Sequence, residues 1–219
     1  MPLELYHPPV PGHVYCMGLD AGGGGGGDPS ALVVLDAMTG PVVEVAALRS
    51  SKLDGRDIAL VAWQLHSYGY TVAKGDQYVP RGGGLVPELN DRDTQHALEA
   101  RFPYDYWYVQ TKSGRPQHPE EVGIRFGLWP TTQAKTEIIS RLKVAITTRA
   151  ILTNNPWLPL EAPYWERFEG NWRFGLKSGS ARGHGDVTIA MALALAGVAQ
   201  IQEHLGVKAF SRISSVGLR

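Results

Sequence analysis

An aspartate stands at the end of the first apolar run of this chain. The run 13–19 leads directly to Asp20, glycines fill positions 22–27 before Asp28, and a second apolar run follows at 31–35. This order predicts a hairpin in which Asp20 lies at the tip of a buried strand. A carboxylate in that position is costly unless a partner offsets its charge, and a divalent metal ion is a common partner.

Two more acids lie at expected element ends. Glu88 falls in a short strand, and Asp186 comes directly before an alanine-rich helix. Converged carboxylates repel one another, and hard divalent cations bound through oxygen relieve that repulsion. Two such ions about 4 Å apart can activate water and stabilise a leaving oxygen in phosphodiester hydrolysis. Simpler interpretations remain open: a turn acid at Asp20, a surface acid at Glu88 and a helix N-cap at Asp186.

The elements that must position these acids are predicted from apolar periodicity and turn residues. Three consecutive strands form an antiparallel meander at about 13–20, 30–37 and 41–49. Helices are expected at about 54–68, 90–101, 132–147 and 186–203, with a short one within 157–168. Further strands are expected at 85–89, 106–110 and 171–176. This alternation predicts an α/β fold with a central mixed sheet flanked by helices.

Length and composition narrow the class of protein. The chain has 219 residues, a formal net charge of zero and one cysteine, Cys16, so no internal disulfide is possible. That cysteine content is typical of a reducing compartment, and Cys16 is expected in the core. The longest apolar run, 189–201, is shorter than the ~20 residues that span a bilayer. We expect a cytoplasmic protein with no membrane partner, organised as an extended lead-in (1–12), one domain (13–204) and a flexible tail (205–219).

Five segments in this order resemble the nuclease domain of the large terminase subunit of tailed bacteriophages, which has the ribonuclease H-like fold. The segments are 15–20 with the glycines after it, 27–36, 86–90, 127–132, and 184–186 with the helix that follows. The resemblance spans about residues 9–199. It implies an endonuclease that uses Mg²⁺ or Mn²⁺, as two ions, to cut double-stranded viral DNA concatemers during genome packaging.

The resemblance also implies site residues and partners. Asp20, Glu88 and Asp186 fall on the metal-binding and catalytic acids of the family, and Asp28 and His184 are possible additional site residues. The implied partners are double-stranded DNA, the terminase ATPase domain, the small terminase subunit and the portal. The implied location is the cytoplasm of an infected bacterial host cell.

Two features depart from the family pattern. Asp76, Asp91 and Asp93 lie near Glu88 in the sequence, so the identity of the middle acid stays open. The phosphate-loop pattern of the family's ATPase domain is absent, so the chain is expected to be a nuclease domain that does not translocate DNA by itself.

A basic stretch comes before the last acid. Arg173, Lys177 and Arg182 are predicted to contact DNA phosphates, which positions a duplex without reading its sequence. A solvated surface loop is the alternative interpretation of the same stretch.

Two other functions remain open. Nucleotide-binding enzymes of the actin and sugar-kinase type also begin with a strand, an acid and a glycine-rich hairpin, although this chain is short for their two-lobed fold. Tight ATP binding would favour that alternative. The third possibility is a catalytically inert DNA-binding assembly module, which metal-independent DNA binding without cleavage would favour.

Overall fold

A mixed β-sheet forms the centre of the computed structural model, which describes residues 3–22, 28–75, 83–88, 92–110, 125–128, 131–174 and 185–204. The predicted antiparallel meander is present as β2 (Tyr15–Asp20), β3 (Ser30–Asp36) and β4 (Val42–Ser50). On the other side of β2, β5 (Leu85–Pro87) runs parallel to it. The predicted α/β class with a mixed sheet is therefore confirmed.

Two short strands complete the sheet beside β4. β1 (Glu4–Leu5) pairs with it antiparallel, and β8 (Ile151–Leu152) pairs with it in parallel, so that the order is β1-β4-β3-β2-β5 with β8 next to β4. The expected lead-in at 1–12 thus contributes a strand. The expected tail, 205–219, lies outside the described residues.

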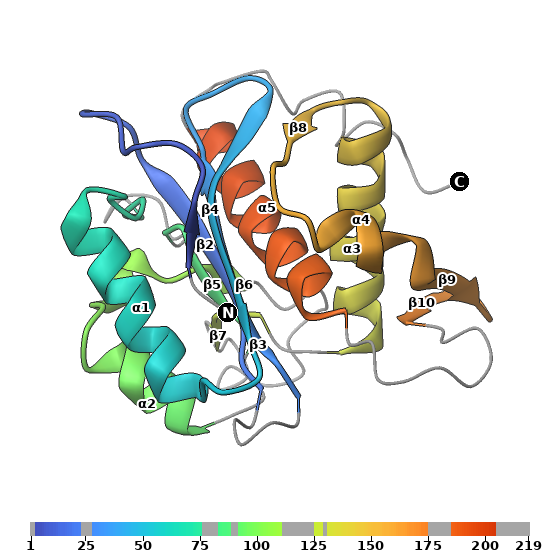
Figure 1. Cartoon of the computed structure of the whole chain (residues 1–219), viewed down its shortest axis with the longest axis horizontal. Helices are drawn as coiled ribbons and strands as arrows, with labels where there is room; N and C mark the ends of the chain where they lie inside the picture. Colours follow the sequence, from blue (N-terminus) through green and yellow to red (C-terminus); the bar gives the residue numbers. More distant parts are fainter. Residues whose placement is uncertain are drawn as a thin grey trace, which may run out of the picture.

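Helices cover both faces of the sheet (Figure 1). α1 (Gly55–Tyr68) and α2 (Arg92–Glu99) lie on one face, and α3 (Thr132–Thr147) and α5 (Asp186–His204) lie on the other. The side chain of Asp54 caps α1, and that of Thr131 caps α3, each by accepting backbone N–H groups of the first turn. Within the described residues, none of the helices combines the length and apolar character that crossing a bilayer requires.

The smaller elements differ from the prediction in two places. The strand expected at 106–110 is confined to β6 (Val109–Gln110), because Tyr104–Tyr106 forms a 3₁₀ turn; β6 pairs with β7 (Arg125–Phe126). The helix expected within 157–168 ends early: α4 (Leu158–Glu161) and a 3₁₀ turn (Ala162–Tyr164) are followed by β9 (Trp165–Phe168). β9 and β10 (Asn171–Phe174) form a hairpin beside α3 and α4 (Figure 1).

The meander is buried on both faces, which explains its continuous apolar sequence. Every residue of β3 is buried; Val33 belongs to the core under α5 and α3, whereas Val34 belongs to the core under α1 and α2. α5 packs directly on β2, because a Cβ atom at Gly18 would lie only 1.9 Å from the carbonyl oxygen of Ala190. Cys16 is fully buried beneath the same helix, as predicted.

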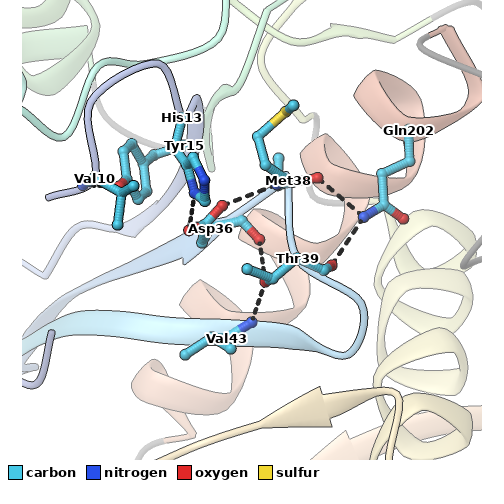
Figure 2. A network of polar contacts seen from close by, with 9 residues as sticks. Val10, His13, Tyr15, Asp36, Met38, Thr39, Val43 and Gln202 are labelled. Carbon is cyan, nitrogen blue, oxygen red and sulfur yellow. Dashed lines mark hydrogen bonds and ion pairs between the residues drawn. The ribbon is translucent and has the colours of Figure 1, made fainter. Parts of the chain in front are cut away.

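A polar network fixes the other end of α5 to the turn between β3 and β4 (Figure 2). The Gln202 amide donates to the carbonyl oxygens of Ala37 (3.0 Å) and Thr39 (3.5 Å). In the same turn Asp36 accepts the N–H of Met38 at 2.9 Å, and its other carboxylate oxygen lies 2.7 Å from Nδ1 of His13. The C-terminal end of α5 is therefore held by hydrogen bonds to the β3–β4 turn.

Candidate functional site

Asp20 and Glu88 occupy neighbouring positions on two parallel strands. β2 and β5 pair with Leu19 beside Pro87, and the backbone N–H of Glu88 donates to the carbonyl of Leu19 at 2.9 Å. The same register places Asp20 beside Glu88. Parallel neighbours lie ~4.8 Å apart, and residues in register project from the same face of the sheet. Both carboxylates therefore lie at the carboxyl end of their strands, on the face that α5 covers.

Asp186 approaches this pair from the start of α5. The carbonyl of Gly185 accepts the N–H of Ile189 at 2.9 Å, so Gly185 holds the N-cap position and Asp186 is the first residue of the helix. The pKa of Asp20 is raised well above its usual value, chiefly by desolvation and then by the negative charges of Glu88 and Asp186. The three predicted acids are thus close enough to interact electrostatically.

Two cationic side chains contact these acids. Nζ of Lys135, on α3, lies 2.9 Å from Oε1 of the buried Glu88, and it also lowers the pKa of Asp20. Nη2 of Arg49, at the end of β4, donates to Oδ2 of Asp186 at 3.3 Å. Across the described residues, no three acidic, histidine or cysteine side chains converge closely enough to hold one metal ion. Glu88 and Asp186 are instead each paired with a cation.

Arg49 reaches the site because of the strand register. It pairs with Ala31 on β3, which pairs in turn with Asp20 on β2. The row Arg49, Ala31 and Asp20 therefore crosses β4, β3 and β2 on one face of the sheet, and Glu88, the residue after β5, continues it. From this row the Arg49 side chain extends to Asp186, the first residue of α5.

A fourth acid, which the sequence reasoning missed, lies beside Asp186. Glu161 ends α4 and is 7% exposed; its Oε2 accepts the backbone N–H (2.8 Å) and the hydroxyl (3.0 Å) of Thr188. Its Oε1 lies 3.3 Å from Nε of Arg49. Burial raises the pKa of Glu161 to about 7, and the charge of Asp186 acts in the same direction.

The signals for these additional residues differ in strength. Arg49 is a charged residue at the end of a strongly apolar strand, which could have marked it as a site residue. Lys135 lies in the first turn of its helix, where nothing in the sequence connects it to Glu88. Glu161 lies between prolines in a segment without periodicity, and the sequence offers no signal for it.

Asp28, predicted as a possible additional site residue, is also described by the structure. It is exposed, and its charge is among those that raise the pKa of Asp20, so it lies at the edge of the acid cluster. Close to both acids, the hydroxyl of Ser30 accepts the N–H of Gly22 at 2.9 Å and donates to the carbonyl of Leu53 at 2.9 Å.

The remaining predicted residues lie elsewhere or outside the description. Asp93, an alternative for the middle acid, forms an exposed ion pair with Arg56 on the opposite face of the sheet. Five predicted residues lie outside the described residues: Asp76, Asp91, Lys177, Arg182 and His184. Arg173 belongs to β10, but the description does not extend to its side chain.

Comparison with protein-family models and with curated protein sequences finds no match. Solved structures do match. The large terminase nuclease from thermophilic phage G20c aligns with a TM-score of 0.60 and 20% identity, over 89% of this chain and 87% of that one. The same nuclease with bound magnesium aligns with a TM-score of 0.60 and 18% identity, over 89% and 86% of the two chains.

A nuclease domain from a second phage has the same architecture. The large terminase nuclease domain of Thermus phage P74-26 aligns with a TM-score of 0.58 and 19% identity, over 88% of this chain and 83% of that one. The predicted ribonuclease H-like fold is therefore confirmed, in the form that large terminase nuclease domains adopt.

Proposed function

We propose that this chain is the nuclease domain of a phage large terminase, a metal-dependent endonuclease that cuts double-stranded DNA concatemers during genome packaging. The observation that carries the proposal is the register of Asp20 beside Glu88, with Asp186 brought over the same strand ends by α5. The fold that holds these acids is shared with terminase nucleases of two phages, one of them also solved with bound magnesium.

The acids fit a hard divalent cation in donor type, and side-chain rotation would have to bring them closer together to hold one. All three are carboxylates, the ligands that Mg²⁺ and Mn²⁺ prefer, and they come from three separate elements that meet at one sheet end. Lys135 contacts Glu88 and Arg49 contacts Asp186, and these ion pairs support the proposal because a cation site needs acids that bind positive charge. Bound Mg²⁺ or Mn²⁺, as two ions, would activate water and stabilise charge on the phosphodiester oxygens.

The residues of the chain have distinct roles in this proposal. Asp20, between the other two acids, would face both ions, whereas Glu88 and Asp186 would each hold one. Asp28 and His184 are additional candidates at the edge of the site. Binding requires Glu88 to exchange its contact with Lys135 for the ions, and Asp186 to reach them while Arg49 stays beside it.

DNA would be positioned by basic residues that precede Asp186. Arg173, Lys177 and Arg182 are the proposed phosphate contacts, because they form a basic stretch shortly before Asp186 in the sequence. Arg173 belongs to β10, and the other two follow it. The proposed assembly partners are the terminase ATPase domain, the small terminase subunit and the portal, within the cytoplasm of an infected bacterial cell.

Cleavage of supercoiled plasmid tests the proposal directly. We expect nicking and linearisation with Mg²⁺ or Mn²⁺, and none with EDTA or with Asp186→Ala. Purified Asp93→Ala is a matched control, because this acid lies in an exposed ion pair away from the cluster and should cut at the wild-type rate. An Asp186→Ala protein that cuts as well as wild type would contradict the assignment.

The same experiment separates the alternatives. DNA binding without cleavage under any divalent ion would support an inert assembly module, and tight ATP binding would support an actin-like or sugar-kinase-like enzyme. The structural likeness described above is to nuclease domains, so nothing in the fold favours the nucleotide-binding alternative.

A further inference from the structure

Glu161 is a buried carboxylate that the three-acid site does not use. Its Oε2 accepts two hydrogen bonds from Thr188, which satisfies a backbone N–H in the first turn of α5. An anion at this end of a helix is favoured by the helix dipole. Glu161 therefore links α4 to the helix turn that carries Asp186, and this anchoring uses only one of its two oxygens.

The other oxygen of Glu161 faces Arg49. Oε1 lies 3.3 Å from Nε of Arg49, although the pair does not have hydrogen-bond geometry, and no other partner of either atom is found among the described residues. The far end of the same guanidinium donates to Asp186 at 3.3 Å. Arg49 thus lies between two buried carboxylates, one at its base and one at its tip.

This placement creates an electrostatic conflict at the acid cluster. A guanidinium paired with Asp186 opposes any divalent cation that approaches the same carboxylate, because the two positive charges repel and share one ligand. Two like charges several ångströms apart at a protein surface repel appreciably, because water screens them only in part. A second carboxylate next to the guanidinium cancels most of that repulsion.

We infer that Glu161 and Arg49 form a charge-balanced pair that positions Asp186 and keeps the arginine from opposing divalent-cation binding at the acid cluster. The inference rests on the proposed metal-dependent function. Arg49 orients the carboxylate of Asp186 toward the sheet, and Glu161 neutralises Arg49. Both are positioning residues, which act on the metal site through Asp186.

The charge-balance inference predicts opposite effects of two substitutions on divalent-cation affinity, which a purely structural role of the two residues would not produce. Glu161→Gln keeps an oxygen that can accept from Thr188 but removes the negative charge, so divalent-cation binding should weaken roughly three- to tenfold. Arg49→Gln removes the positive charge, so binding should tighten by a similar factor. The double variant should return to within about twofold of wild type, because the two charge changes cancel.

Isothermal titration of Mg²⁺ and Mn²⁺ into the DNA-free chain, at a pH of about 8.5 and so above the pKa of about 7 of Glu161, measures these affinities without any cleavage step. Arg56→Gln is the matched control, because Arg56 is an exposed arginine paired with an exposed Asp93; its affinity should equal that of wild type. Thermal unfolding in EDTA confirms that each variant is folded.

The outcomes are distinguishable. A wild-type chain that binds neither ion contradicts the proposed metal-dependent function. If wild type binds and the two single variants shift affinity in the same direction, or not at all, the charge-balance inference fails while the proposed function stands. If Arg49→Gln does not fold, Glu161→Gln alone decides, because unchanged or tighter binding by that variant overturns the inference.

Discussion

The ammonium group of Lys135 lies 2.9 Å from Oε1 of Glu88, a side chain that is only 3% exposed. Lys135 is itself more than one-third exposed, so the contact joins a partly exposed lysine to a buried acid at the sheet end. Removing the lysine would leave a buried charge without its partner, whereas a divalent cation could replace it. The lysine therefore stabilises the acid cluster and at the same time competes with a metal ion for Glu88.

Lys135→Met tests this dual effect. We expect Mg²⁺ to bind roughly three- to tenfold more tightly, because a positive charge beside the site is lost. The free energy of unfolding in EDTA should fall by about 1–3 kcal/mol, because Glu88 loses its partner. Titration calorimetry and urea unfolding measure the two changes. Lys74→Met, which alters an exposed lysine near an exposed Asp105, should change neither; equal effects in the two variants would refute the competition.

Asp20→Asn should separate stability from activity. We expect plasmid cleavage to be lost, because the proposed central ligand loses its charge. The metal-free protein should become more stable at neutral pH, since a desolvated carboxylate that is repelled by Glu88 and Asp186 is replaced by a neutral amide. Thermal unfolding in EDTA beside the cleavage assay gives both values. Cleavage at the wild-type rate would remove Asp20 from the site.

The pKa of Glu161 gives the metal-free protein a specific pH dependence. This pKa rises from 4.5 to about 7 on folding, so the folded state holds the proton more tightly than the unfolded state. The resulting stability is fully present below about pH 4.5 and is lost as the pH rises through 7. Compared with wild type, Glu161→Gln should therefore gain up to about 3 kcal/mol between these limits. Urea unfolding from pH 4 to 8 in EDTA checks this, and parallel curves for the two proteins would contradict it.

Two acids of the site and the antiparallel meander could be predicted from the sequence, because each is marked by a local pattern of residues. Asp20 and Asp186 stand next to long apolar segments, so their positions at element ends were visible, and the meander was visible because three apolar runs are separated by turn residues. The strands β1 and β8 were not predicted, because two residues carry no periodicity.

The contacts between the acids and their charged neighbours could not be predicted from the sequence, for a different reason. Arg49 approaches Asp186 only because β4 pairs with β3 in a register that shifts at a bulge near Val34. Glu161 approaches it only because α4 lies against the first turn of α5. Both relationships depend on tertiary packing. Arg49 and Asp186 are 137 residues apart, and Glu161 lies in a segment without periodicity, so no local sequence pattern indicates either contact.

The close approach of α5 to β2 predicts the effect of a single methyl group. In Gly18→Ala the new Cβ would lie 1.9 Å from the carbonyl oxygen of Ala190, so α5 must shift and carry Asp186 with it. We expect a loss of stability of roughly 1–3 kcal/mol and a marked loss of cleavage. Gly12→Ala is the control: its φ of +81° is unfavourable for alanine, but no atom lies within 4 Å of the added Cβ. Cleavage should be retained in the control, and equal inactivation of both variants would contradict the explanation.

The basic stretch before Asp186 is tested through salt dependence. In Lys177→Ala and Arg182→Ala, the slope of log binding constant against log salt for a DNA duplex should fall by about one each. Arg141→Ala, on an exposed turn of α3 paired with Glu137, should leave the slope unchanged. Fluorescence anisotropy with labelled duplex, in Ca²⁺ to limit cleavage, supplies the slopes. An unchanged slope removes that residue from the interface.

The double anchoring of α5 has a mechanical consequence. With 19 residues the helix is about 28 Å long; Gln202 bonds its last turns to the β3–β4 turn, and Glu161 bonds its first turn to α4. A helix that is hydrogen-bonded to the rest of the fold at both ends resists tilting. Asp186 therefore cannot move away from Asp20 unless the hydrogen bonds at one end of α5 break. The amides of α5 should therefore exchange with solvent as one cooperative unit, near the rate set by global unfolding. The range of positions open to the Asp186 backbone would then be set by the rigidity of the whole helix α5.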